Sequence, residues 1–240
     1  MLGVVCCRPG GRGRPVRDMM LGLPVWRLEL DTDCFSARRR SIRGVRRLVK
    51  LGVRRVLLPE EFAHSTLLEQ MGLVPVEPTG LYAALAGQLT LAALTGRGEQ
   101  PNRAGVTLCS AGVDAPFARA ARFLCPRVKR LTLCAGRGGE RLAAQLYRDF
   151  GAAVELGEDG QGLRVQFDGA NDPEVLDISR PQLYMPELLL SVPGLELPTD
   201  WPADRVLTAL WQSGRIGTER IEVCGAGKKT LTDAKAGTIM

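Results

Sequence analysis

Short apolar runs alternate with longer amphipathic segments from residue 25 to residue 178 of this 240-residue chain. The apolar runs predict strands at residues 26–30, 54–58, 73–76, 105–109, 129–134, 153–156, 163–167 and 175–178. The amphipathic segments predict helices at residues 36–50, 60–71, 80–95, 114–124 and 140–150. Strands and helices that alternate in this way form β-α-β units. We therefore predict an α/β fold with a doubly wound, mainly parallel sheet, built as one continuous sheet or as two α/β halves.

The charge pattern of two strands predicts their places in a sheet. The strand at residues 105–109 contains no charged residue, which suits the centre of a sheet. The strand at residues 26–30 alternates apolar with charged residues, which suits an edge.

Composition shifts along the chain predict four regions. Residues 1–24 combine four arginines with several glycines and prolines, and we expect a disordered basic extension. Residues 25–100 form the N-terminal α/β half, and residues 101–224 form a second half that ends with a helix near residues 202–212. Residues 225–240 lack apolar periodicity, and we expect a flexible tail.

The positive charge is concentrated at the start of the chain. The formal net charge is +6, and residues 1–55 hold 14 Lys and Arg against 4 Asp and Glu. Much of this charge lies on the helix predicted at residues 36–50, which could hold phosphates without sequence preference. We expect a solvated outer face instead, because charge runs usually are solvated. Aromatic residues make up only 5%, which is low for a protein that stacks on bases, and we expect no nucleic-acid partner.

The cysteines and the single histidine restrict the compartment and the chemistry. Seven cysteines at irregular spacings include no C-x-x-C pair, so we expect a reduced, cytoplasmic protein. His64 is the only histidine, which excludes a multi-histidine metal site, and we expect no metal. No apolar run approaches 18 residues, so we expect no membrane span.

A glycine-containing turn after the strand at residues 105–109 predicts a ligand site. Ser110, Gly112 and Ala115 occupy the three places of the dinucleotide-binding fingerprint, and Gly112 keeps the position that approaches a pyrophosphate. The amides of the turn, which also contains Ala111 and Val113, would attract an anion at a helix start. Arg137 follows the next strand, where an arginine suits the 2′-phosphate of NADP.

Residues 106–156 resemble the NADP-binding half of shikimate-dehydrogenase-like proteins, which belong to the Rossmann superfamily. The resemblance covers about a fifth of the chain, and Ser110 departs from the glycine of the fingerprint. It implies a Rossmann-like fold and a nucleotide, NADP(H), as cofactor. The residues identify neither a substrate nor a catalytic group.

Two other functions are compatible with the sequence. A Rossmann-like fold without chemistry would serve as an interaction module, which could form a homo-oligomer through the Pro- and Leu-rich residues 181–198. Alternatively, Asp31 and Asp33 resemble the D-x-D motif of haloacid-dehalogenase-type phosphatases. Glu61 and His64 have the E-x-x-H spacing of carboxylate-bridged metal sites, but a second such pair is missing, so His64 is a surface residue or a lone acid/base.

Overall fold

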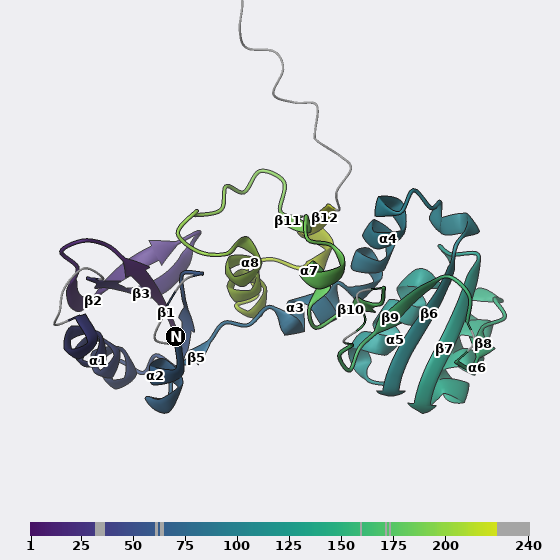
Figure 1. Ribbon diagram of the computed structural model, residues 1–240, viewed down its shortest axis with the longest axis horizontal. Helices are drawn as coiled ribbons and strands as arrows, with labels where there is room; N and C mark the ends of the chain where they lie inside the picture. The colour runs from purple at the N-terminus through teal and green to yellow at the C-terminus, as the bar shows by residue number, and fades with distance from the viewer. Residues whose placement is uncertain are drawn as a thin grey trace, which may run out of the picture. The chain divides into compact units, whose positions relative to one another are not determined.

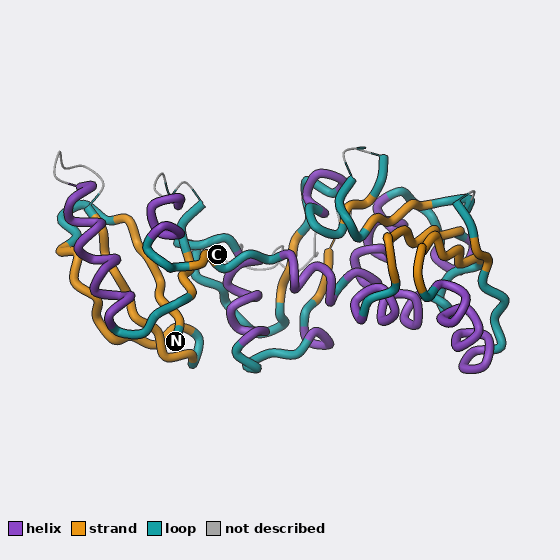
Figure 2. The backbone as a smooth tube through the Cα atoms, turned by 90° about the horizontal axis from the view of Figure 1, so that it is seen from below, coloured by secondary structure: helices purple, strands orange, loops and turns teal. Residues whose placement is uncertain are grey.

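The computed structural model describes residues 1–31, 37–60, 62, 65–158, 160–170, 172 and 174–224. The chain divides into two compact units. Unit 1 contains residues 1–78 and 192–221, and unit 2 contains residues 79–191 and the residues from 222 onward. Figure 2 shows strands and flanking helices in both units.

Unit 1 is a five-stranded, parallel-rich sheet with the strand order β2-β3-β1-β4-β5. Its strands are β1 (Leu2–Cys7), β2 (Arg12–Met20), β3 (Leu23–Leu30), β4 (Arg55–Leu57) and β5 (Val74–Pro75). Its helices are α1 (Ala37–Lys50), α2 (Ser65–Gln70), α8 (Ala203–Gln212) and the short 3₁₀ helix η2 (Thr218–Arg220). Only β2 is antiparallel to its neighbour, β3.

The prediction that residues 1–24 form a disordered extension is wrong. These residues form β1, β2 and the start of β3, and β1 lies in the middle of the unit 1 sheet. The apolar run of β1 is mostly buried, with Val5 fully buried. Pro15 is accommodated because β2 is an edge strand, where a missing amide donor is tolerated. Gly11 brings the backbone against Leu30, where a Cβ atom would lie 2.6 Å from its carbonyl carbon.

The core of unit 1 joins the sheet to α1 and α2. Val5 and Leu28 from the sheet pack with Val45 and Leu48 from α1 and with Leu68 from α2. Each of these five side chains is at most 1% exposed. Their burial removes apolar surface from water, which is the dominant stabilising term of such a fold.

Unit 2 is a five-stranded sheet in which every pair of strands is parallel (Figure 1). Its strands are β6 (Gly105–Gly112), β7 (Arg130–Arg137), β8 (Glu155–Leu156), β9 (Leu163–Gln166) and β10 (Leu176–Asp177). Its helices are α3 (Thr79–Ala84), α4 (Ala86–Gly96), η1 (Pro101–Arg103), α5 (Ala115–Leu124), α6 (Gly139–Phe150) and α7 (Pro181–Tyr184). A separate antiparallel pair joins β11 (Leu189–Ser191) to β12 (Glu222–Cys224).

The strand order of unit 2 is β10-β9-β6-β7-β8, so β6 is the central strand, as its lack of charge predicts. Read from β8, this is the 3-2-1-4-5 order that a doubly wound, Rossmann-like sheet has in its first five strands. The predicted α/β class with a mainly parallel sheet is therefore confirmed. The prediction that the strand at residues 26–30 is an edge is wrong, because β2 covers β3 on its outer side.

The boundary between the units differs from the predicted one near residue 100. Helices α3 and α4 belong to unit 2 because they contact α5. Helix α8, predicted as the end of the second half, belongs to unit 1, where it contacts β4. In the same unit the Trp201 indole donates a hydrogen bond of 2.8 Å to the Val5 carbonyl.

Among the residues that the structure describes, no helix combines the length and the apolar character needed to cross a membrane. The predicted tail at residues 225–240 lies outside the described residues.

Candidate functional site

Two strand-to-helix turns meet at the carboxyl edge of the unit 2 sheet. The β6–α5 turn (residues 110–115) leads from the central strand into α5, and the β7–α6 turn (residues 136–140) leads from its neighbour into α6. In open α/β sheets ligands bind outside the carboxyl ends of the strands, at the point where the strand order reverses. That point lies between β6 and β9, so it borders the β6–α5 turn, and the β7–α6 turn follows on the neighbouring strand at the same carboxyl edge.

The β6–α5 turn is held closed by backbone pairing and by a helix cap. Strand β6 stays in register with β7 as far as Gly112, which lies opposite Arg137. The Val113 amide then donates a 2.9 Å hydrogen bond to the Arg137 carbonyl. One residue later, the Asp114 carboxylate accepts a 2.8 Å hydrogen bond from the Phe117 amide and caps α5.

A second carboxylate fills the β6–α5 turn from strand β9. Asp168, just beyond the end of β9, accepts a short hydrogen bond from the Ala111 amide. The Ser110 hydroxyl lies 3.4 Å from the same carboxylate and 2.8 Å from the Gly112 carbonyl. An acidic side chain of the protein therefore occupies the place at which the fingerprint expects a phosphate.

The β7–α6 turn differs from the β6–α5 turn because the amides at the start of α6 have no acceptor among the described residues. Gly138 adopts a φ of +86°, a conformation that favours glycine, and it precedes α6 without a side-chain cap. The first hydrogen bond of the helix runs from Leu142 to the Gly138 carbonyl, at 3.0 Å. No described residue accepts a hydrogen bond from the amides of residues 139–141. These donors, together with the positive end of the helix dipole, form an open place for an anion.

Gly136 explains how close the two turns lie. A Cβ atom at this position would lie 2.5 Å from the Ala111 carbonyl oxygen. Only glycine therefore allows β7 to pass β6 here. Gly112 faces no such restriction, because a Cβ atom there would have its nearest neighbour at 3.9 Å.

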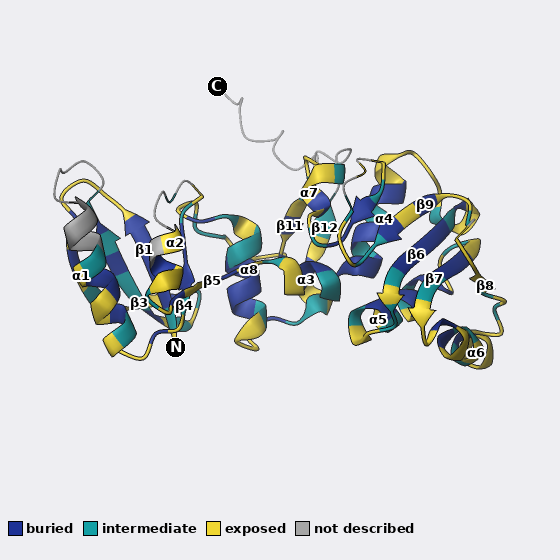
Figure 3. Cartoon of the chain, turned by 60° about the horizontal axis from the view of Figure 1, so that its bottom comes forward, coloured by how far each residue is buried: buried dark blue, intermediate teal, exposed yellow. Residues whose placement is uncertain are grey.

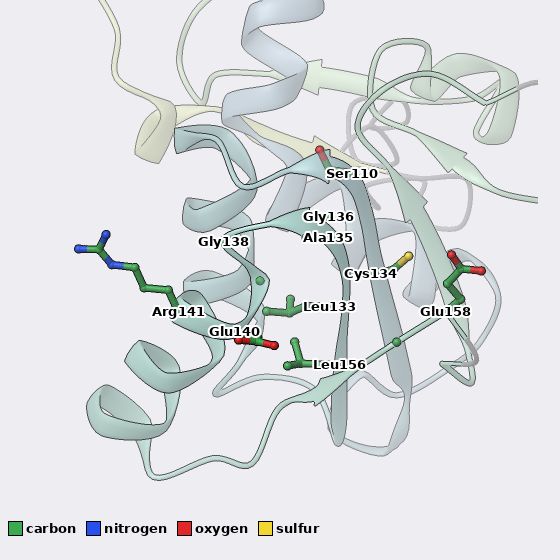
Figure 4. A pocket seen from close by; sticks show the side chains of 12 residues that line it. Ser110, Leu133, Cys134, Ala135, Gly136, Gly138, Glu140, Arg141, Leu156 and Glu158 are labelled. Carbon is green, nitrogen blue, oxygen red and sulfur yellow. The ribbon is translucent and has the colours of Figure 1, made fainter.

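A cavity of about 710 Å³ opens beside the β7–α6 turn (Figure 4). Leu133 and Leu156 provide apolar walls, and Gly138 and Gly139 bring the start of α6 to its edge. Figure 4 shows Glu140 close to Leu156, and the Arg141 side chain directed away from the cavity. Glu158 adds a second carboxylate from the segment after β8. The lining is thus apolar, acidic and rich in backbone donors.

Two cysteines lie side by side on the strands that reach the cavity. Cys109 on β6 and Cys134 on β7 are opposite each other in the parallel register. Burial raises the pKa of the Cys109 thiol to about 11, so this group is protonated at neutral pH and is a poor nucleophile. Cys134 is half-buried and lines the cavity.

A second hollow, of about 530 Å³, lies at the ends of β9 and β10. Its buried acid, Asp177, accepts hydrogen bonds from the Ala170 amide at 3.0 Å and from the Ser179 amide and hydroxyl at 2.8 and 2.7 Å. Three donors satisfy this carboxylate, so it stabilises the loop after β10. We therefore take the β7–α6 cavity as the candidate site.

One of the residues predicted from the sequence lines the cavity, and others belong to the β6–α5 turn. Ser110 lines the cavity, whereas Ala111, Gly112, Val113 and Ala115 belong to the closed turn beside it. Arg137 lies opposite Gly112, but its exposed side chain is not part of the lining.

Sequence reasoning missed the second turn and the acids of the cavity: Gly138, Gly139, Glu140 and Glu158. A usable signal was present, because three glycines within residues 136–139 directly follow a predicted strand and precede a predicted helix.

The residues behind the other hypotheses are only partly described. Asp31 directly follows β3, while Asp33 and His64 lie outside the described residues. Arg27 and Glu29, which interrupt the apolar pattern of β3, are partly exposed and form an ion pair at 3.6 Å.

Comparisons with known proteins give no relative for this chain. No model of a known protein family matches it, and a search of the curated proteins finds no significant match.

Proposed function

We propose that unit 2 binds a nucleotide in the cavity beside the β7–α6 turn, with a phosphate at the start of α6. The observation that carries this proposal is the set of unpartnered amides at residues 139–141, which open into a 710 Å³ cavity at the carboxyl edge of the sheet. Ligand pockets of small-molecule sites have volumes of roughly 300–1,000 Å³, so the space suits a nucleoside with its phosphates.

The remaining lining supports the other parts of a nucleotide. Leu156 is 50% exposed, and its apolar surface is available to a base. Glu140 and Glu158 carry carboxylates, which accept hydrogen bonds from ribose hydroxyls. The polar groups are few and surround an apolar floor at Leu133, as is usual for sites that bind small molecules.

The proposal keeps NADP(H) as a candidate and adds a preference. Arg137 is the residue that would hold a 2′-phosphate, but its side chain does not line the cavity. Glu140 and Glu158 do line it, and their charge opposes a phosphate on the ribose. We therefore expect NADH, or another nucleotide with free ribose hydroxyls, to bind at least as tightly as NADPH.

A thermal-shift screen with NADPH, NADH, ATP and S-adenosylmethionine tests the proposal. A nucleotide at about 100 times its Kd should raise the free energy of unfolding by about 2.7 kcal/mol and raise Tm by about 5 °C or more. If none of these ligands changes Tm, the proposal is wrong, and the non-catalytic interaction module becomes the better hypothesis.

Matched variants locate the site. Gly139→Asp places a carboxylate at the start of α6, where a Cβ atom meets its nearest neighbours at 3.6 and 3.8 Å. We expect this variant to keep its unliganded Tm, because an acid favours a helix start, and to bind the nucleotide about 100-fold more weakly. Gly112→Asp puts the same charge at the β6–α5 turn, where a Cβ atom has its nearest neighbour at 3.9 Å, and should keep most of the binding. The reverse ranking would move the site to the β6–α5 turn.

A further inference from the structure

The charged residues of unit 1 are arranged differently on the two faces of its sheet. In the pairing of β2 with β3, Arg17 lies opposite Trp26 and Arg12 lies opposite Leu30. Residues opposite each other in an antiparallel pair share a face. Trp26 and Leu30 pack with the core residues of α1, so Arg12 and Arg17 belong to the α1 side of the sheet.

On the other face of the sheet, two arginines form ion pairs with acidic residues of unit 1. Arg27 forms ion pairs of 3.0 Å with Asp18 and 3.6 Å with Glu29. Arg8 lies 3.9 Å from Glu29 and 3.7 Å from Asp200. Arg8 and Arg27 on that side therefore have acidic partners within unit 1.

Helix α1 continues the positive side with a stripe of four exposed cations. Arg43, Arg46, Arg47 and Lys50 follow the i, i+3, i+4, i+7 spacing of one helix face. Figure 3 shows that α1 carries both exposed and buried residues. The opposite face is buried through Val45 and Leu48.

The stripe is fixed against β2 by close packing. A Cβ atom on Gly44 would lie 2.9 Å from the Leu28 side chain and 3.2 Å from the Gly13 carbonyl oxygen. The Arg47 guanidinium also donates a 3.3 Å hydrogen bond to that carbonyl. The helix stripe and the arginines of the edge strand therefore form one surface.

In this surface, which we call the basic face, no cation has an acidic partner among the described residues. Its six residues are Arg12, Arg17, Arg43, Arg46, Arg47 and Lys50. None of them forms an ion pair with another described residue. Helix α1 contains no acidic residue, and like charges four positions apart destabilise a helix. The fold thus maintains a repulsive cluster that an external polyanion would neutralise.

We propose that the basic face binds the phosphate backbone of double-stranded nucleic acid without sequence preference. The stripe from Arg43 to Lys50 extends about 10 Å along the helix axis, and a duplex carries one phosphate charge per about 1.7 Å of its axis. Several cations of a rigid helix can therefore contact phosphates at the same time. The low aromatic content argues only against base stacking, which this mode of binding does not use.

The apolar residues of α1 argue against a lipid surface as the partner. Helices that lie in a membrane interface insert an apolar face next to their cations. In the described part of α1 the apolar side chains are instead buried or half-buried against the sheet: Ile42, Val45, Leu48 and Val49. Beside the stripe the described residues expose one large apolar side chain, Leu51, at 39%, whereas a membrane-bound helix inserts a whole apolar face.

Fluorescence anisotropy with the full chain and two labelled 20-base-pair duplexes of unrelated sequence tests the proposal. We expect equal affinity for both duplexes. If five of the six cations of the basic face contact phosphates, the slope of log K against log salt should be about −4 to −5. The variant R43E/R46E/K50E should bind about 100-fold more weakly at 0.1 M salt, and its slope should be shallower by about 2.7. Arg47 is left unchanged because it holds the helix to β2.

The control R103E/R119E/R148E changes the net charge equally through exposed arginines of unit 2. It should keep its affinity within about threefold. An equal loss in both triple variants, no binding by the natural sequence at 50 mM salt, or binding only to vesicles containing 30% phosphatidylserine would each overturn the proposal. If the charge-reversed variant fails to fold, R43Q/R46Q/K50Q must show the same change of slope.

Discussion

The β6–α5 and β7–α6 turns of unit 2 are built alike but offer opposite chemistry. Each leads from a parallel strand into a helix at the same edge of the sheet, and each contains glycine. The Asp168 carboxylate accepts a hydrogen bond from the Ala111 amide of the first turn, and Asp114 of the same turn caps α5 at the Phe117 amide. The amides at the start of α6 have no acceptor among the described residues, and a cavity lies beside them.

The difference teaches that glycines alone do not define an anion site in this fold. Gly112 occupies the fingerprint position, yet the Asp168 carboxylate, from beyond β9, accepts a hydrogen bond from the neighbouring Ala111 amide. Gly136 is required for packing, and Gly138 for a helix start with free amides. Free donors, rather than the spacing of glycines, distinguish the candidate site.

Replacing one glycine in each of the two turns should give the largest difference. Gly136→Ala should lower the free energy of unfolding by about 1–3 kcal/mol, because its Cβ would lie 2.5 Å from a backbone oxygen that cannot move freely. Gly112→Ala should change it by less than about 0.5 kcal/mol. Calorimetric Tm values measure both, and equal losses would contradict the close approach of β7 to β6.

The stability of the folded chain should depend on pH through the buried thiol of Cys109. The folded-state pKa of Cys109 is raised to about 11 by burial, from an ordinary value of 9.0. The folded chain therefore keeps a proton that the unfolded chain releases above pH 9. Its contribution to stability is full below pH 9 and is lost as the pH rises towards 11, by up to about 1.4 kcal/mol per pH unit.

Denaturant titrations from pH 8 to 11 measure this loss. Cys109→Ala should remove this share of the pH dependence, while the Cys6 thiol, whose pKa burial also raises to about 11, continues to contribute. A pH profile that Cys109→Ala leaves unchanged would contradict the burial of this thiol.

Removing the carboxylate that fills the β6–α5 turn should make the two turns more alike. Asp168→Ala leaves the Ala111 amide without its acceptor and should cost about 1 kcal/mol of stability. It should also strengthen the binding of inorganic pyrophosphate several-fold, because the turn regains a free donor and loses a negative charge. Isothermal titration measures the affinity; unchanged binding would mean that Asp168 does not block this turn.

The smallest effect is expected at Arg137. Its side chain lies outside the cavity lining, so Arg137→Glu should change the affinity for NADH by less than about twofold. A tenfold or greater loss of NADPH binding, with NADH binding retained, would instead support the 2′-phosphate role that the sequence predicts for this residue.

Much of unit 2 could be predicted from the sequence because its signals are local. The five strands between residues 105 and 178 follow apolar runs, and an uncharged run predicts the central place of β6. Unit 1 was harder to predict from the sequence. The glycines and prolines in and around β2 argue against a strand, and β2 is stabilised mainly by its pairing with β3. Residues 192–221 belong to unit 1 because of contacts such as the hydrogen bond from Trp201 to Val5. Such contacts between distant residues cannot be predicted from a local sequence pattern.

The candidate site shows the same limit. The sequence predicts the start of α5 to within one residue, whereas β6 continues to Gly112, three residues beyond the predicted end of the strand. The closing of the turn depends on Asp168, which is 58 positions away from Ser110 and carries no motif. The open turn was predictable in part, from its three glycines between a strand and a helix.

A two-dimensional ¹⁵N–¹H NMR titration with NADH and ATP tests the central claim most directly, because it reports on each amide separately. The account predicts that the largest shifts occur at Gly139, Glu140 and Arg141, while Ala111 and Val113 change little. Saturable shifts confined to residues 111–115, or no saturable shift at millimolar nucleotide, would contradict it.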